Sequence, residues 1–424
     1  MNPTATKGLL YPAMHKFYSA LNSLEQFQKG NNFFDNISCL DNFFSEYRNI
    51  TFVLQKSLAH TEYENIYEEY REKYLLNETC KWFVEKRNEV LKQHPFNLEK
   101  RITITLYSTQ TSIALPEYVF TIENDVEYST IIDSLKSLFI DINPVEVFFS
   151  VEFSFFEKGQ DKELYDDLIK GINSMKIFMS CMKETIKEEC NLCNQLELKI
   201  NELNFYRVPK NMLFIEDFAY YSQEDRFEKA SRTELMTPDS SRRMPLSDFC
   251  KFLNIDSSVK RNAFDDFISL HIVIFSMQKT LMPTFMIVYE DETFSLNTFH
   301  ASIKTTMFRK INDIAKSIEP DNIKSIFYVA EMLKYANANN DYEDILKINS
   351  NDRVKYKTSE LLCFYMLNKD LTFQYHLFDS EKINDMKYVI SVLRKSPKEK
   401  AFIGFLQPIR DEFIKINSEK KKPQ

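Results

Sequence analysis

The spacing of apolar residues in this chain changes at Pro95, and this change restricts the folds that the chain can adopt. Before Pro95, apolar side chains recur every three or four residues, as at Phe17, Leu21 and Leu24, which is the period of an amphipathic helix. Beyond Pro95, apolar side chains occupy every second position of residues 145–155, which is the period of a strand. The sequence therefore predicts an α+β fold that is predominantly helical, with a block of helices first.

Four helices are expected before Pro95, at residues 13–29, 35–58, 62–75 and 77–94. Gly30 suits the position after a helix C-terminus, and Asn77 can cap the N-terminus of the fourth helix. Four amphipathic helices joined by short connections indicate an antiparallel bundle. We expect this bundle to form a first domain, residues 1–97.

The remaining sequence predicts two further domains. Residues 98–240 should form a small α+β unit with strands at 102–106, 118–122 and 145–155, a helix at 127–140 and one long helix at 161–204. The polar stretch 237–243 is the best candidate for a linker, so a boundary is placed near residue 240. Residues 241–424 should form a C-terminal α+β domain of unknown role, with helices at 246–254, 263–278, 298–318, 381–394 and 409–416 and strands at 284–289, 325–332, 361–367 and 371–377.

The scarcity of glycine argues against nucleotide-driven chemistry. The 424 residues include only five glycines, and no two of them lie close together. Loops that cradle phosphates need clustered glycines, so that backbone N–H groups can approach the ligand. The sequence therefore contains no Walker loop, dinucleotide fingerprint or kinase loop.

Cysteine usage, hydropathy and charge indicate the compartment and the partners. The seven cysteines are widely scattered and odd in number, which is untypical of a disulfide framework and favours a reducing compartment. Neither a secretory signal nor a convincing membrane span is present, so we expect a cytoplasmic protein without a membrane partner. The net charge of −8 argues against a broad basic surface, although residues 77–101 carry six Lys/Arg against four Asp/Glu.

Arg87, Asn88 and His94 are the main candidates for a functional site. Arg87 and His94 lie seven positions apart, which on a continuous helix places both on one face about 10 Å apart. Histidine can transfer protons near neutral pH, and arginine presents a planar fork to phosphate oxygens.

The order Arg87-Asn88, five residues and then His94 resembles the catalytic motif of the HEPN superfamily, whose members carry it on the last helix of a small bundle. The resemblance covers only residues 12–96. It implies a metal-independent endoribonuclease without a cofactor, of the kind found among toxins and antiviral abortive-infection effectors. In that family the bundle dimerises so that two motifs face each other. We therefore expect an RNA substrate, a homodimer formed through the N-terminal bundle, and a regulatory C-terminal region that could also engage a protein partner.

Three alternatives stay open, and one of them places the activity in the C-terminal half, where no motif is recognised. Arg87 could pair with a carboxylate of the preceding helix while His94 interacts with the helix C-terminus, in which case both residues are structural. The protein could also be a non-catalytic scaffold or adaptor that uses the bundle and the long helix for oligomerisation.

Three other motifs are more readily explained by packing than by function. Cys190 and Cys193 have the spacing of a redox pair, but they continue the apolar stripe of their helix, without a histidine nearby. The tyrosines at 63, 67, 70 and 74 have the helical spacing of a buried bundle face. His271 lies in an apolar segment and is expected to be a core histidine.

Overall fold

The computed structural model describes residues 8–27, 32–187, 189–231, 243–252, 262–335, 347–384, 387–395 and 404–419. It confirms the α+β class, with helices and two antiparallel sheets. The chain forms two compact units rather than the three consecutive domains expected. Unit 1 comprises Met1–Ile104, Glu117–Leu135 and Val151–Glu216, and unit 2 comprises Thr105–Pro116, Lys136–Ser150 and Asp217–Gln424. Each unit is therefore assembled from three separate stretches of sequence.

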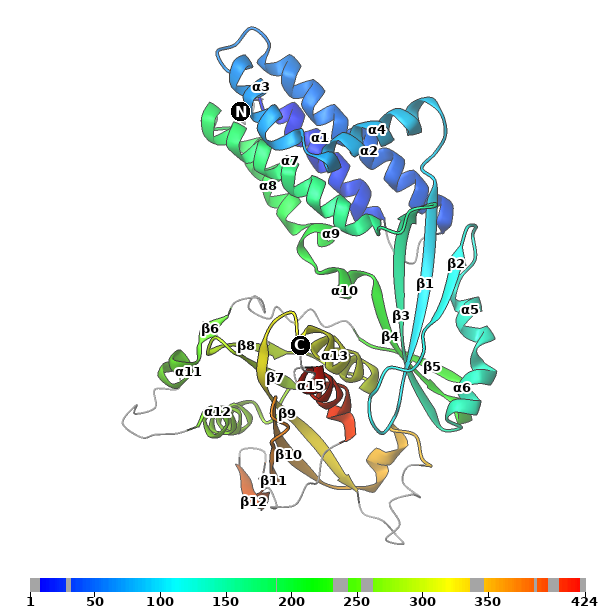
Figure 1. The fold of residues 1–424 in the computed structure, drawn as a ribbon, viewed down its shortest axis with the longest axis vertical. Helices are drawn as coiled ribbons and strands as arrows, with labels where there is room; N and C mark the ends of the chain where they lie inside the picture. The colour runs from blue at the N-terminus through cyan, green and yellow to red at the C-terminus, as the bar shows by residue number, and fades with distance from the viewer. Residues whose placement is uncertain are drawn as a thin grey trace. The chain divides into compact units, whose positions relative to one another are not determined.

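The four helices expected at the N-terminus are present in unit 1: α1 (Tyr11–Gln26), α2 (Phe33–Leu58), α3 (Glu64–Leu75) and α4 (Glu78–Lys92) (Figure 1). The side chain of Asn77 caps α4 by accepting a hydrogen bond from the Cys80 amide at 3.0 Å, as predicted. Asn32 caps α2 in the same way through the Asp35 amide. Gly30, which was expected to end the first helix, lies outside the described residues.

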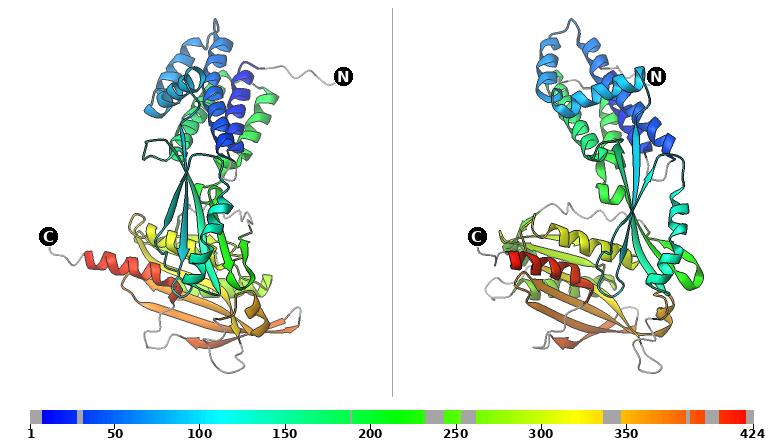
Figure 2. Two further views of the ribbon diagram at one scale, coloured as in Figure 1. Left: turned by 90° about the vertical axis from the view of Figure 1, so that its right-hand side faces the viewer. Right: turned by 45° about the vertical axis from the view of Figure 1, so that its right-hand side comes forward.

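The prediction of a single long helix at 161–204 is wrong, because this segment forms two helices, α7 (Leu164–Ile186) and α8 (Asn191–Glu202). Lys187 adopts a left-handed backbone conformation with φ of 51°, which ends α7. Cys190 then caps α8, because its Sγ accepts a hydrogen bond from the Cys193 amide. Both helices belong to the bundle, since α7 packs against α3 and α8 packs against α1 (Figures 1 and 2). The segment is therefore not a free arm.

Aromatic rings fill the interior of unit 1. Phe83 of α4 lies against Phe43, Phe44 and Tyr47 of α2, with ring centroids 4.8–5.5 Å apart. On the α7 side, a Cβ atom added to Gly171 would lie only 2.2 Å from Cε2 of Phe83. Glycine at this position therefore lets α7 approach α4 closely.

The predicted tyrosine row faces α7 as a packing surface. Tyr67 is buried and its ring lies 6.0 Å from that of Phe178. Tyr70 Oη lies 3.1 Å from Thr185 Oγ1, so the polar ends of the row also have partners on α7. The packing interpretation is confirmed for Tyr67, which is buried, whereas Tyr63, Tyr70 and Tyr74 are half-buried.

The first sheet has the strand order β2-β1-β3-β4-β5. Its strands are β1 (Leu98–Tyr107), β2 (Tyr118–Ile122), β3 (Glu146–Glu157), β4 (Ile215–Tyr221) and β5 (Arg226–Lys229). The predicted strands at 102–106, 118–122 and 145–155 are therefore confirmed. The helix expected at 127–140 is present as α5 (Tyr128–Ser134) and α6 (Lys136–Ile142), and the short helices α9 (Asn204–Arg207) and α10 (Lys210–Leu213) precede β4. Three of the five boundaries between the units along the chain fall within β1, β3 and β4, and the other two lie at 116/117 and 135/136.

Unit 2 contains the second sheet, whose order is β12-β11-β10-β9-β7-β8-β6. Alternate residues of its strands face two different cores, as the period of a strand requires. Tyr328 and Ala330 of β9 pack in one core with helices α13 and α15, whereas Phe327 and Val329 pack in the other with α12. The elements of this unit are β6 (Met244–Pro245), α11 (Leu246–Phe252), α12 (Ala263–Gln278), β7 (Thr284–Tyr289), β8 (Thr293–Thr298), α13 (Lys304–Ser317), β9 (Ile323–Tyr335), β10 (Lys357–Asn368), β11 (Phe373–Asn384), β12 (Lys387–Lys395) and α15 (Gln407–Glu419), with short 3-10 turns at Ser222–Glu224, Asp352–Tyr356 and Gly404–Leu406.

The prediction of one helix in this region is wrong. Residues 381–394 were expected to be helical, but they form the end of β11 and most of β12, which pair as antiparallel strands. The stabilisation from pairing with β11 at the edge of the sheet is larger here than the preference of the apolar pattern for a helix. The remaining helices and strands expected after residue 241 are present near their predicted positions. Of the predicted linker at 237–243, all but Arg243 lies outside the described residues.

Over the described ranges, no helix is at once long enough and apolar enough to cross a lipid bilayer.

Candidate functional site

Arg87 and Asn88 lie on the last two turns of α4. Arg87 is half-buried and its Nη1 donates a hydrogen bond to Oδ1 of the exposed Asn88 at 3.1 Å. Its Nε is buried and has no hydrogen-bond partner among the described residues. No carboxylate in those ranges forms an ion pair with Arg87, so the alternative in which Arg87 pairs with the preceding helix is not observed there. Among the described residues, the hydrogen bond to Asn88 is therefore the one polar contact that orients the Arg87 guanidinium.

His94 lies beyond the end of α4, not on its last turn. The helix ends at Lys92, and the His94 amide donates to the Glu89 carbonyl at 3.2 Å, which widens the final turn. A residue that precedes proline is disfavoured in the helical conformation, which explains this ending before Pro95. The prediction that the helix carries His94 on the same face as Arg87 therefore has to be corrected.

The side chain of His94 is exposed and partly oriented by its own backbone. Its Nδ1 lies 2.9 Å from the Pro95 carbonyl oxygen. A carbonyl can only accept, so this contact requires a proton on Nδ1 and leaves Nε2 of the neutral ring as a free base. The exposed nitrogen is thus the one that could take a proton from a substrate.

Arg87 and His94 lie beside different parts of α2. Cζ of Arg87 is 6.0 Å from the ring centroid of Phe52. His94 lies near Asp41: burial raises the pKa of Asp41, whereas a hydrogen bond from the Phe96 amide and the charge of His94 act in the opposite direction. Asp41 and Phe52 are three turns apart on α2, roughly 16 Å along its axis. One copy of the chain therefore presents the side chains of Arg87 and His94 beside separate parts of α2.

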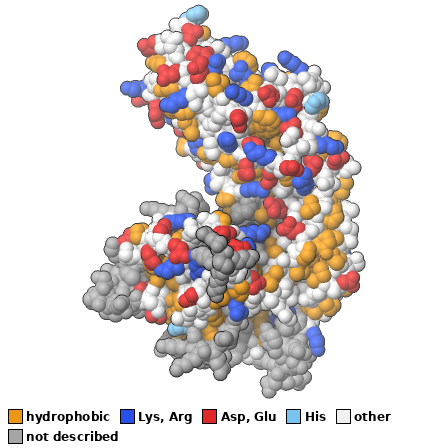
Figure 3. Space-filling model, in the orientation of Figure 1, with side chains coloured by type: hydrophobic (Ala, Val, Ile, Leu, Met, Phe, Trp, Pro, Cys, Tyr) orange, Lys and Arg blue, Asp and Glu red, His pale blue; other side chains and the backbone are white. Residues whose placement is uncertain are grey.

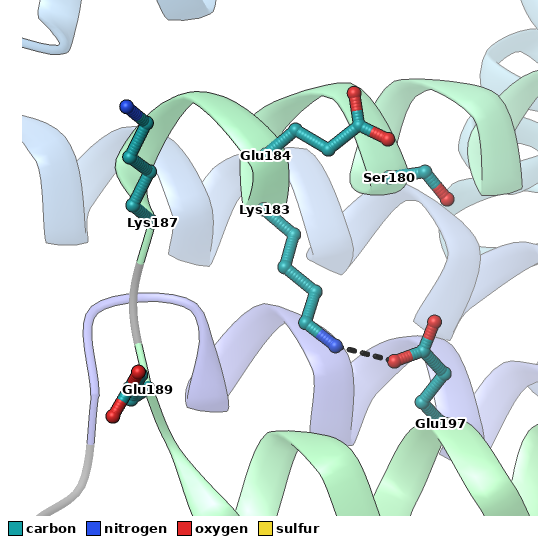
Figure 4. A pocket seen from close by; sticks show the side chains of 6 residues that line it. All are labelled: Ser180, Lys183, Glu184, Lys187, Glu189 and Glu197. Atoms are coloured by element: carbon teal, nitrogen blue, oxygen red, sulfur yellow. Dashed lines mark hydrogen bonds and ion pairs between the residues drawn. The ribbon is translucent and has the colours of Figure 1, made fainter.

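Two hollows lie elsewhere on the described surface of unit 1. The larger, of about 470 Å³, lies where α7 turns into α8 and is lined by Ser180, Lys183, Glu184, Lys187, Glu189 and Glu197 (Figure 4). Lys183 is paired there with Glu197, as the dashed line in Figure 4 marks. The other, of about 320 Å³, includes Trp82 and Lys86 of α4, and Lys86 is paired with Glu89 and Glu157. Neither of these two hollows is lined by Arg87, Asn88 or His94.

The sequence did not identify two residues that join Arg87 in space. Arg48 and Phe52 lie one turn apart on α2, with Cζ of Arg48 4.0 Å from the centroid of the Phe52 ring. The charge of Arg71 on α3 also acts on Arg48. The spacing of Arg48 and Phe52 was a usable signal for a cation–aromatic pair.

The cysteine pair and His271 are structural. Cys190 and Cys193 are both buried, and no group of three potential metal ligands occurs within the described ranges. His271 is buried in unit 2, and its Nδ1 lies 2.8 Å from the Phe267 carbonyl. Burial lowers the pKa of His271 to about 4, so the ring is neutral near neutral pH. The core interpretation of these residues is confirmed.

Charges of both signs occur on the helices of unit 1. On the face drawn in Figure 3, acidic and basic side chains of the described residues are interspersed over these helices. This face of the helices therefore does not form a broad basic surface.

Comparison with known proteins adds no assignment: no protein-family model matches the chain, and neither a curated protein nor a solved structure is significantly similar to it.

Proposed function

We propose that this protein is a metal-independent endoribonuclease of the HEPN type, acting as a toxin or an anti-phage effector. The observation that carries the proposal is that the reactive groups of Arg87 and His94 are uncommitted at the surface of a helical bundle. Arg87 has no carboxylate partner among the described residues, and Nε2 of His94 is free of any hydrogen bond recorded there. The resemblance of the motif supplies the reaction type.

In this proposal, Nε2 of His94 removes the proton of a ribose 2′-hydroxyl. The resulting alkoxide attacks the adjacent phosphorus, and the bond from phosphorus to the 5′-oxygen breaks. A protonated His94 from a second copy gives its proton to that leaving oxygen. The products are a 2′,3′-cyclic phosphate and a free 5′-hydroxyl, and the proton count balances between the two histidines.

Arg87 stabilises the negative charge that develops on the phosphate oxygens, and Asn88 holds one of its guanidinium nitrogens. One copy provides one histidine, so a base and an acid together require two copies. This need supports the homodimer that the motif resemblance implies. Unit 2 would then restrain or direct the nuclease.

The test compares expression of the parent protein with that of His94→Ala and Arg87→Ala. We expect the parent to produce RNA fragments and growth toxicity, and each variant to lose both by at least about a hundredfold, the usual effect of removing an acid–base or charge-stabilising group. His15→Ala is the matched control, because His15 is an exposed histidine on α1 of the same unit. It should cleave like the parent.

If the His94 and Arg87 variants both cleave RNA as well as the parent, the nuclease proposal is wrong. A folded parent that releases no fragments would instead favour the scaffold or adaptor role. That role would have to use the bundle surface, because α7 and α8 are packed within unit 1.

A further inference from the structure

Arginine and phenylalanine side chains from α2, α3 and α4 form a small patch on unit 1. Phe52 is 37% exposed, Cζ of Arg48 lies 4.0 Å from its ring centroid, and Cζ of Arg87 lies 6.0 Å from the same centroid. Arg71 is the third cation, close enough for its charge to act on Arg48. We call Arg48, Phe52, Arg71 and Arg87 the arginine–phenylalanine patch.

The patch holds more positive charge than the described residues neutralise. Arg71 pairs with Glu68 at 2.8 Å, whereas neither Arg48 nor Arg87 has an ion-pair partner in the described part of the chain. Burial lowers the pKa of Arg48, Tyr67 raises it, and the charges of Arg71 and Arg87 lower it further. Like charges held close together repel, and an anion placed among them would relieve the repulsion.

The two unpaired guanidiniums are held differently. Arg48 donates to Oγ1 of the buried Thr51, which fixes it over the Phe52 ring. Arg87 makes a single hydrogen bond, to Asn88, and its buried Nε has no partner in the described structure. Buried donors without partners are rare in folded proteins. Arg87 can therefore reorient toward an anion without breaking an ion pair.

We propose that the arginine–phenylalanine patch binds one nucleotide of single-stranded RNA, with its base against the exposed part of the Phe52 ring and its phosphate between the guanidiniums of Arg48 and Arg87. An exposed aromatic ring beside arginines is the combination that binds unstacked bases and their backbone. A base in a duplex is already stacked and cannot use the ring. The choice of RNA rests on the proposed function, whereas the patch itself rests on the contacts above.

The patch makes Arg48 and Phe52 substrate-binding residues, while Arg87 belongs to both the patch and the proposed catalytic group. A strand held by Phe52 would thus present a phosphate to Arg87. The patch would set where the RNA lies before cleavage.

The test uses the full chain carrying His94→Ala, so that RNA is not consumed, and follows the fluorescence anisotropy of a short labelled single-stranded RNA. We expect Arg48→Gln and Phe52→Leu each to raise the Kd about tenfold. Arg48→Gln should also reduce the slope of log Kd against log salt by about one. Phe52→Leu should leave that slope unchanged, because it removes stacking and no charge.

Arg101→Gln is the matched control. Arg101 also stacks on a ring, with its Cζ 4.0 Å from the Phe156 centroid, but it is paired with Glu99 and Phe156 is only 9% exposed. This variant should bind RNA like its parent. A duplex of the same sequence should bind more weakly, and a single-stranded DNA should lose affinity in the same two variants if base stacking and phosphate contact dominate.

Unchanged affinity in both Arg48→Gln and Phe52→Leu would overturn the patch, even if the protein with His94 restored cleaves RNA. Absence of any RNA binding by the parent would overturn it as well. Loss of affinity in the two variants, with no cleavage by the protein that retains His94, would support the patch and reject the nuclease.

Discussion

Two arginines of unit 2, Arg309 and Arg353, are held differently from Arg48 and Arg87 of unit 1. In unit 2, Arg309 of α13 makes a bidentate pair with the buried Asp217, with Nε–Oδ1 and Nη2–Oδ2 distances of 2.7 and 2.9 Å. Arg353 is likewise paired with the buried Glu146 at 3.0 Å. These guanidiniums are fixed by carboxylates that have lost their contact with water.

In unit 1, Arg48 and Arg87 lie beside Phe52 and have no such partner within the described ranges. This difference indicates which arginines are available to bind an anionic ligand. A paired, buried arginine holds the fold together, and removing it leaves an uncompensated charge. An unpaired arginine beside an exposed ring contributes little to the fold and remains free to meet an anion. The following changes test this contrast, in order of decreasing expected effect.

Arg309→Gln should lower the stability of unit 2 by about 3 kcal/mol or more, because it leaves the Asp217 carboxylate buried without its cation. Hydrogen exchange at the amides of β9 and β10 would measure the loss, since both strands lie in the core of this unit. Replacing both partners, as in Arg309→Met with Asp217→Leu, should recover much of it. Unchanged exchange in Arg309→Gln would contradict the structural role of the pair.

Gly171→Ala should lower the stability of unit 1 by roughly 1–2 kcal/mol, because the new methyl group would collide with Phe83. The clash opposes the gain of about 1 kcal/mol that alanine normally brings to a helix. Trp82 is the sole tryptophan and lies in unit 1, so its fluorescence during urea unfolding reports the change.

Phe83→Leu provides the control for this substitution. The double variant should be more stable than the sum of the two single changes predicts, because the smaller side chain removes the collision. Simple additivity would show that the clash with Phe83 is not the cause.

Arg48→Gln should lower the stability of unit 1 by no more than about 1 kcal/mol, the usual net contribution of one hydrogen bond, because Arg48 is half-buried and donates to Thr51. It loses a contact with Phe52 but relieves repulsion from Arg71 and Arg87. Thr51 keeps a hydrogen bond, since its hydroxyl also donates to the Arg48 carbonyl at 3.0 Å. If the Trp82 unfolding curve instead shows a loss of several kcal/mol, Arg48 stabilises the fold as Arg309 does. The proposed difference between the two arginines would then be wrong.

Local patterns were sufficient to predict most of the elements but not where each begins and ends. The Asn77 cap and the alternation at 145–155 act over a few residues, so the sequence predicts α4 and β3 well. The break between α7 and α8 was missed because the apolar stripe continues across it and the left-handed residue is a lysine. The pairing of β11 with β12 was missed because residues 381–394 also fit a helical period.

The candidate site was predictable only in part, because a local pattern does not encode contacts between separate helices. The sequence identifies Arg87, Asn88 and His94 as a motif, which is a local property. It does not show that Pro95 moves His94 off the helix, nor that Arg48, Phe52 and Arg71 from other helices gather near Arg87. Those placements depend on how α2, α3 and α4 pack, and no short spacing encodes that packing.

The interleaving of the two units along the chain has a consequence for biosynthesis. The bundle needs α7 and α8 against α3 and α1, so it cannot be completed until the ribosome has made residues beyond 202. Until then the apolar faces of α1 and α3 lack their covering helices, and contacts so distant in sequence form slowly. The bundle can therefore be completed only after about half of the 424 residues have been made.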